Sequence, residues 1–105
     1  MSREVLSHQF DAPRTGELHE PHVTAHVSQF QPGHYYLRNL SVSPDYRGQG
    51  IGTRFMHHLI REHDRAHTSL TLHTARPELV HWYGAMGFQS EGEDLFGTRM
   101  TRAPR

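Results

Sequence analysis

The sequence predicts an α/β domain in which a mixed β-sheet carries two main helices. Three observations lead to this prediction. Apolar and polar residues alternate in two separate runs between positions 22 and 43, apolar residues recur every four positions within 50–67, and a third alternating run covers 69–75. Alternation is typical of strands, and a period near 3.6 is typical of helices. The strand–helix–strand order also favours parallel pairing of the two strands that flank the helix.

The N-terminal third of the chain is expected to form a β-hairpin. Residues 1–10 contain Val5, Leu6 and Phe10 and predict a short strand or a partly ordered end. The segment 11–21, with two prolines and a glycine, predicts a loop or hairpin connection. The alternating runs 22–30 and 34–43 are separated by Gln31-Pro32-Gly33, which is a turn signal. We therefore expect these two strands to pair in antiparallel fashion.

The rest of the chain predicts two helices and two strands. Ile51, Phe55 and Leu59 form the centre of an apolar stripe, which indicates an amphipathic helix over 50–67. After the strand 69–75, Pro77 suits the first position of a second helix and Gly87 suits its C-cap. A last strand is expected over 94–101, followed by a short tail.

Composition limits what the protein does. The length of 105 residues predicts a single domain spanning 1–105. An apolar fraction of 34% and a mean hydropathy of −0.74 predict a thin core. A bound ligand, or a second subunit in a homodimer, would help to stabilise such a core. Eleven basic and eleven acidic residues cancel, which gives no electrostatic case for a general nucleic-acid binder. The absence of cysteine excludes a disulfide framework and a thiol nucleophile. No apolar run approaches 18 residues and the N-terminus does not resemble a signal peptide, so we expect a soluble cytoplasmic protein without membrane contact.

Histidine is unusually frequent, with eleven residues scattered along the chain. Only His63 and His67 share the i, i+4 spacing of a metal pair on a predicted helix, and no third ligand follows from spacing. A solvated, weakly basic surface is therefore the favoured interpretation, with a metal-binding protein as the less favoured one.

The most informative stretch lies between the second alternating strand and the first helix. Pro44 ends the strand, and Arg47-Gly48-Gln49-Gly50-Ile51-Gly52 follows directly before the helix. Free N–H groups and the dipole at a helix N-terminus favour an anion, and glycine allows close approach to the backbone. The spacing matches neither the dinucleotide fingerprint nor the P-loop, and a plain turn is the alternative interpretation.

Two ordered motifs resemble a known family. Arg47-x-x-Gly50-x-Gly52, after a strand that ends Leu40-x-Val42-x-Pro44, resembles the acetyl-CoA signature of the GCN5-related N-acetyltransferase (GNAT) family. Downstream, the segment Trp82-Tyr83-Gly84-Ala85-Met86-Gly87-Phe88 is similar to the family's Leu-Tyr-x-x-x-Gly-Phe. The resemblance covers residues 36–101. It implies the GNAT-like (acyl-CoA N-acyltransferase) fold and transfer of an acetyl group from acetyl-CoA to a primary amine.

The resemblance also implies site residues. Pyrophosphate would bind the glycine-rich turn, the pantetheine arm would pair with the strand, and a strand N–H would donate to the thioester oxygen. Tyr83 would protonate the leaving thiolate as general acid, with a core tyrosine as the alternative. The family often has an asparagine seven residues before this tyrosine, where the chain has Arg76. The expected cofactor-binding residues are Leu40, Ser41, Val42, Arg47, Gly48, Gln49, Gly50, Ile51, Gly52, Thr53 and Arg76.

The base and the acceptor are less determined. No carboxylate occupies the central-strand positions where the family often places its base, and His73 is the candidate with suitable chemistry. A satisfied histidine within the sheet is the favoured alternative, and a water chain would also serve. Only about 21 residues precede the hairpin, too few for the strand and two helices that the family usually has there, so the fold is expected to be truncated at its N-terminus. This truncation favours a second function, a non-catalytic CoA-binding or protein-interaction module.

Overall fold

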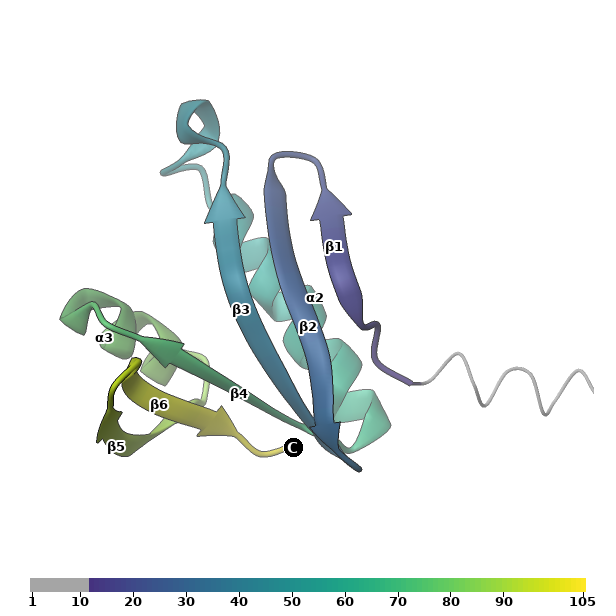
Figure 1. The fold of residues 1–105 in the computed structure, drawn as a ribbon. Helices are drawn as coiled ribbons and strands as arrows, with labels where there is room; N and C mark the ends of the chain where they lie inside the picture. The colour runs from purple at the N-terminus through teal and green to yellow at the C-terminus, as the bar shows by residue number, and fades with distance from the viewer. Residues whose placement is uncertain (1–11) are drawn as a thin grey trace, which may run out of the picture.

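The structure, a computed structural model, describes residues 12–105, and the strand or end predicted within 1–10 lies outside this range. Its centre is a six-stranded mixed sheet in the order β1-β2-β3-β4-β6-β5. Both long helices, α2 and α3, cover the same face of the sheet and leave the opposite face without a helix in this part of the chain (Figure 1). The predicted α/β architecture with a mixed sheet and two main helices is confirmed.

The first three strands form an antiparallel meander. β1 (Gly16–Glu20), β2 (Val23–Gln31) and β3 (His34–Val42) pair in sequence order, and the hairpin predicted over 22–43 is confirmed. The prediction of a loop over 11–21 is wrong, because β1 lies within it. β1 is short and buries a single large apolar side chain, Leu18. One apolar residue is too little alternation to indicate a strand, and pairing with β2 provides the stabilisation.

A β-bulge interrupts β3. Thr24 pairs with Ser41 and His26 with Arg38, so Ala25 alone faces the two residues at 39 and 40. Asn39 has a left-handed backbone with φ 60°. Because one extra residue inverts the alternation of side chains, the bulge brings Leu40 to the helix-covered face.

The sheet is split at its centre. β4 (Ser69–Thr74) runs parallel to β3, as predicted, but the two strands pair only from His34↔Ser69 to Tyr36↔Thr71. Beyond these pairs the strands diverge into a V (Figure 1). The divergence leaves a gap next to the C-terminal ends of both strands.

Within residues 12–105, the two helices supply five of the fifteen buried apolar side chains, and most of the others come from the strands. α2 (Ile51–Ala66) follows a short 3-10 turn, η1 (Pro44–Tyr46), and buries Phe55, Met56 and Leu59 against the sheet. α3 (Pro77–Ala85) begins at the predicted proline, and Met86 is its C-cap, with Gly87 at φ 99° directly after it. None of the helices in residues 12–105 is long and apolar enough to cross a membrane.

The C-terminal segment forms a hairpin of two strands. β5 (Gln89–Asp94) and β6 (Gly97–Arg102) pair in antiparallel fashion around a two-residue tip, Leu95 and Phe96. The prediction of one strand over 94–101 is therefore wrong. Every residue of β5 is exposed, and its sequence, QSEGED, carries no apolar alternation that would indicate a strand.

Candidate active site

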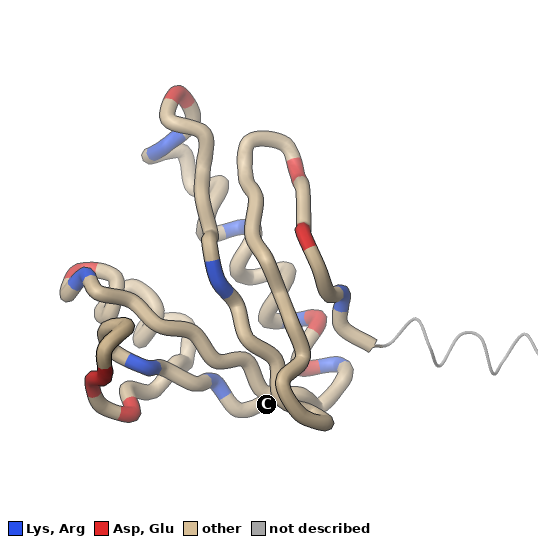
Figure 2. Tube along the Cα trace, in the orientation of Figure 1, with Lys and Arg blue, Asp and Glu red and all other residues tan. Residues whose placement is uncertain are grey.

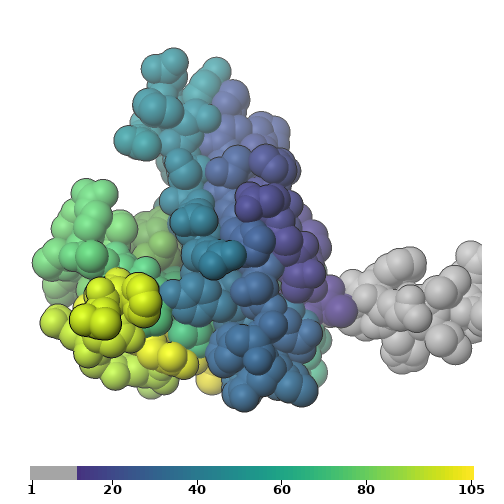
Figure 3. All heavy atoms as spheres, in the orientation of Figure 1, coloured from purple at the N-terminus to yellow at the C-terminus, as the bar shows by residue number. Residues whose placement is uncertain are grey.

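A cleft of about 460 Å³ lies between the end of β3, the glycine-rich turn, the first turn of α2 and α3. Figure 3 shows the molecule hollowed between β3 and α3, beyond the point where the sheet splits. The cleft gathers all of the expected cofactor-binding residues except Gln49, which does not line it. The residues concerned are Leu40, Ser41, Val42, Arg47, Gly48, Gly50, Ile51, Gly52, Thr53 and Arg76.

The N-terminus of α2 points its free donors at this cleft. Gly50 is the N-cap, has a left-handed backbone with φ 79°, and provides no side-chain cap. The first helical hydrogen bond is from the N–H of Arg54 to the carbonyl of Gly50, at 3.0 Å. The N–H groups of Ile51, Gly52 and Thr53 therefore precede the helical ladder and are available to an anion.

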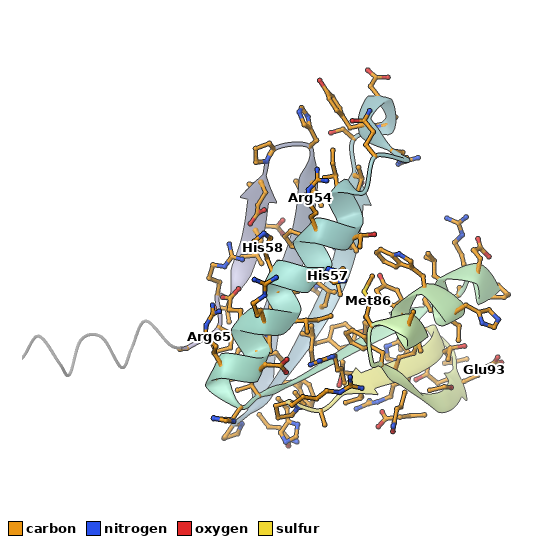
Figure 4. All side chains as sticks on the ribbon, turned by 180° about the vertical axis from the view of Figure 1, so that it is seen from behind. Arg54, His57, His58, Arg65, Met86 and Glu93 are labelled. Atoms are coloured by element: carbon orange, nitrogen blue, oxygen red, sulfur yellow. The ribbon has the colours of Figure 1, made fainter. Side chains whose placement is uncertain are left out.

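Three arginines lie in or near the cleft, and each of them already has a partner. Arg47 Nε donates to the carbonyl of Val42 at 3.0 Å, which holds the turn against the end of β3. The Arg76 guanidinium pairs with Glu78 at 2.6 Å, and both side chains are more than half exposed. Arg54 lies at the start of α2, at the same end of the helix (Figure 4). Its Nη1 lies 3.5 Å from the carbonyl of Gln49.

One wall of the cleft is apolar and was missed by the sequence reasoning. Leu79 and Trp82 come from α3, and Tyr46 comes from η1. The ring of Tyr46 stacks on His22, with centroids 3.4 Å apart, and Ser43 N–H donates to the carbonyl of His22 at 2.8 Å. The β1–β2 turn therefore supports the glycine-rich turn from outside, a contact between distant segments that no local pattern indicates.

Tyr83 lies at the inner end of the cleft. It is 6% exposed, packs against Phe88 with ring centroids 5.6 Å apart, and faces a second cavity as well as the cleft. Burial raises the pKa of the Tyr83 phenol. The phenol therefore keeps its proton at neutral pH and is available as a proton donor.

The second cavity, of about 180 Å³, lies in the split between β3 and β4. Tyr83, Leu40 and Leu79 line both cavities, and His73 lines this one. The structure therefore brings the two predicted catalytic side chains, Tyr83 and His73, to one cavity. Its lining combines Tyr83, from a helix, with His73, whose side-chain partners Tyr36 and Asp94 come from β3 and β5.

His73 has two side-chain partners. Its Nδ1 lies 2.5 Å from the hydroxyl of Tyr36, and its Nε2 lies 2.8 Å from Asp94 Oδ2. Phe96 packs against the imidazole edge-on, with ring centroids 5.8 Å apart. Sequence reasoning missed Tyr36 and Asp94, because Asp94 belongs to a hairpin that was predicted as a single strand.

The charges around His73 favour a neutral tyrosine and an ionised aspartate. Burial, followed by the negative charge of Asp94, raises the pKa of Tyr36. A hydrogen bond from the N–H of Phe96, followed by the one from His73, lowers the pKa of Asp94. Acidic residues gather on this hairpin (Figure 2).

The histidine pair at 63 and 67 does not form a surface metal site. His63 is 2% exposed and its Nδ1 lies 2.8 Å from Thr68 Oγ1, whereas His67 is the C-cap of α2. Within residues 12–105, no three histidine, aspartate or glutamate side chains are grouped to hold a metal ion.

Solved structures share this fold. The chain superimposes on an acetyltransferase of the GNAT family from Staphylococcus aureus Mu50 with a TM-score of 0.67 and 16% identity, covering 80% of this chain and 60% of that one. It matches the ribosomal-protein-S18-alanine N-acetyltransferase of Escherichia coli with a TM-score of 0.68 and 19% identity, covering 93% and 75%. It also matches the PaiA N-acetyltransferase of Thermoplasma acidophilum, solved in complex with coenzyme A, with a TM-score of 0.65 and 17% identity, covering 77% and 52%. These similarities define the acyl-CoA N-acyltransferase fold.

The sequence identifies the family. The family described as "Acetyltransferase (GNAT) domain" matches residues 17–90. The chain therefore belongs to the GNAT acetyltransferase family, a family of acyltransferases whose cosubstrate is acetyl-CoA. The chain spans about three-fifths of the length of the first two structures that share its fold. No curated protein matches it significantly in sequence.

Proposed function

We propose that this protein is an N-acetyltransferase that transfers the acetyl group of acetyl-CoA to a primary amine. The observation that carries the proposal is the uncapped N-terminus of a 16-residue helix, which opens into a cleft of about 460 Å³ shared with Tyr83. Membership of the GNAT family supports the same reaction class.

Cofactor binding would use the backbone more than side chains. The pyrophosphate would accept hydrogen bonds from the N–H groups of Ile51, Gly52 and Thr53, where the helix dipole favours negative charge. The pantetheine arm would lie along Leu40–Val42, next to the bulge, with Trp82 as the apolar wall opposite. Arg47 would add positive charge at the turn.

The chemistry would take place at the inner end of the cleft. The amine attacks the thioester carbonyl, a C–N bond forms, and the C–S bond breaks as the oxyanion collapses. Tyr83 donates its proton to the departing thiolate, which in a water-poor site is a strong base. A backbone N–H near Leu40 would donate to the oxyanion.

The acceptor would enter from the face that lacks the helices. His73 lines the cavity in the split together with Tyr83, so an amine in that cavity lies between the two side chains. We assign His73 to the removal of the proton that the ammonium group must lose before attack.

Two measurements test the proposal. Calorimetry with CoA and acetyl-CoA should show saturable binding, and no binding at millimolar cofactor would contradict the whole assignment. Turnover of acetyl-CoA should then be measured with a peptide that has a free N-terminus, a lysine-containing peptide with a blocked N-terminus, and a polyamine. Cofactor binding without turnover of any amine would instead support the non-catalytic CoA-binding module.

A homodimer stays a prediction from the thin core and the expected truncation, and a cytoplasmic location stays a separate prediction from the sequence. Leu95 and Phe96, 98% and 73% exposed at the hairpin tip, offer apolar surface for such a contact. Light scattering at micromolar concentration should give twice the monomer mass, and a fully active monomer would contradict the prediction.

A further inference from the structure

The open face of the sheet carries a continuous chain of hydrogen bonds at the vertex of the split. Tyr36 belongs to the last residue pair that joins β3 to β4, His73 lies two residues further along β4, and Asp94 ends β5. Three separate strands therefore contribute to one cluster beside the cavity that His73 shares with Tyr83. We propose that Tyr36, His73 and Asp94 form a proton relay that deprotonates the acceptor amine. This inference rests on the proposed function.

The protonation states follow from the contacts. The Asp94 carboxylate has both oxygens engaged: Oδ1 accepts from the N–H of Phe96 at 2.8 Å, and Oδ2 lies 2.8 Å from His73 Nε2. An ionised carboxylate only accepts hydrogen bonds, so Nε2 carries the proton of the neutral imidazole. Nδ1 then has the free lone pair, and the hydroxyl of Tyr36, 2.5 Å away, donates to it.

This arrangement sets the direction of proton transfer. Since the lone pair of Nδ1 is occupied by the Tyr36 proton, His73 receives the proton of the amine through the tyrosine. The ammonium N–H bond breaks as its proton passes to Tyr36 Oη, and the Oη–H proton passes at the same time to Nδ1. The products are a neutral amine and an imidazolium ion, paired with Asp94, that later returns the proton to water.

Burial and packing make the cluster more than a surface ion pair. The side chain of His73 is 12% exposed, and the edge of the imidazole contacts Phe96. The three groups have distinct roles. Tyr36 does not itself line the cavity and would take the proton from the acceptor on the open face, as the amine enters. His73 would store the proton, and Asp94 is a positioning residue that fixes the tautomer.

Glu91 provides a matched control on the same strand. Its carboxylate is 45% exposed, as is that of Asp94, and it accepts hydrogen bonds at 2.9 Å from Arg99 Nε and from Thr101 Oγ1. Neither of these hydrogen bonds involves His73. Replacing Glu91 removes a hydrogen-bonded carboxylate from β5 and leaves the hydrogen bonds among Tyr36, His73 and Asp94 in place.

The first experiment reads the tautomer directly and needs no acceptor. Long-range ¹H–¹⁵N spectra of uniformly labelled protein, with His73 assigned by its loss in His73→Gln, should show the Nε2–H tautomer. Asp94→Asn should give mixed tautomers, and Glu91→Gln should leave the spectrum of His73 unchanged. An Nδ1–H tautomer in the wild type would overturn the relay.

The second experiment measures kcat, KM and the pH profile with acetyl-CoA and the peptide that has a free N-terminus. Tyr36→Phe should lower kcat by about 10²–10⁴-fold, the usual range for a positioned proton-transfer group. Asp94→Asn should lower kcat by about 10- to 100-fold, because an amide no longer stabilises the imidazolium. CoA affinity should stay the same in both variants.

The outcomes separate the relay from the function that it serves. The relay alone would be overturned if the wild type turns over the peptide and both Tyr36→Phe and Asp94→Asn behave as Glu91→Gln does. A wild type that binds CoA but acetylates none of the three amines would overturn the proposed function, and the relay with it.

Discussion

Replacement of Gly52 by alanine should strengthen the fold and weaken CoA binding at the same time. Gly52 is the second residue of α2 and lines the cleft where the pyrophosphate would bind. A Cβ at this position would lie 3.4 Å from Val42 Cγ2 and 3.8 Å from the Trp82 ring, which are ordinary contacts. The protein therefore accommodates the methyl group, but the group occupies cleft space beside the N–H donors.

The expected magnitudes have opposite signs. Alanine is favoured over glycine in a helix by about 0.5–1 kcal/mol, which for a domain of this size raises Tm by roughly 2–8 °C. Crowding a close-packed contact costs about 1–3 kcal/mol. At 1.4 kcal/mol for each factor of ten, the Kd for CoA should rise about 5- to 150-fold. Thermal unfolding by circular dichroism and calorimetry with CoA measure the two effects.

Gly84→Ala is the matched control. Gly84 also lies in a helix, α3, and a Cβ there would meet nothing within 4 Å. This variant should gain stability without any change in CoA affinity. Gly50 is less suited to the test, because its φ of 79° would add backbone strain to any effect on binding. Unchanged CoA affinity in Gly52→Ala would refute the placement of the pyrophosphate at this helix N-terminus.

Three further predictions concern catalysis and stability. Tyr83→Phe should lower kcat by about 10²–10⁴-fold with CoA affinity unchanged, and full activity in steady-state assays would remove Tyr83 from the mechanism. Burial lowers the pKa of His63 from 6.5 to about 4, against the opposing charges of Glu62 and Asp64, so the unfolded state binds more protons between these values. The contribution of neutral His63 to the free energy of unfolding should be fully present above pH 6.5 and should fall by roughly 3 kcal/mol towards pH 4. Urea titrations should show that the free energy of unfolding of His63→Leu depends less steeply on pH. The same pH dependence in the variant and the wild type would contradict this. Gly97→Ala should lower the free energy of unfolding by about 1–3 kcal/mol, because its Cβ would lie 2.6 Å from the carbonyl oxygen of Thr74 and because residue 97 has a φ of 113°. An unchanged free energy of unfolding in urea would contradict this prediction.

The elements that the sequence predicted well are those with local signals. The stripe through Ile51, Phe55 and Leu59 predicted a helix over 50–67, and α2 spans Ile51–Ala66 with Gly50 and His67 as its caps. Pro77 likewise marked the start of α3. In each case the residues that specify the element lie within it, so a window of the sequence contains the necessary information.

The elements that it missed depend on distant partners. β1 and β5 are edge strands with almost no apolar alternation, and their neighbours β2 and β6 hold them in the sheet. The relay was missed for the same reason. Asp94 reaches His73 only because the chain turns back at Leu95 and Phe96, and a single strand over 94–101 does not contain that turn.

The bulge in β3 shows how a small irregularity organises the site. Tyr35 and Leu37 face the helices, and strict alternation would continue with positions 39 and 41, which are Asn39 and Ser41. The extra residue opposite Ala25 brings the next apolar pair, Leu40 and Val42, to the helix side instead, where both line the cleft.

The sequence already indicates the bulge, because the spacing between apolar residues changes from two positions, Tyr35 to Leu37, to three positions, Leu37 to Leu40. A one-residue register change inverts every following side chain, so the cleft would otherwise have a polar wall where the pantetheine arm is proposed to lie. The bulge lies beside the split of β3 from β4, and Leu40 lines both the cleft and the cavity in the split. The same segment of β3 therefore shapes both the cleft and the cavity, and in the proposed mechanism the two reactants would meet at Tyr83 from opposite faces of one sheet.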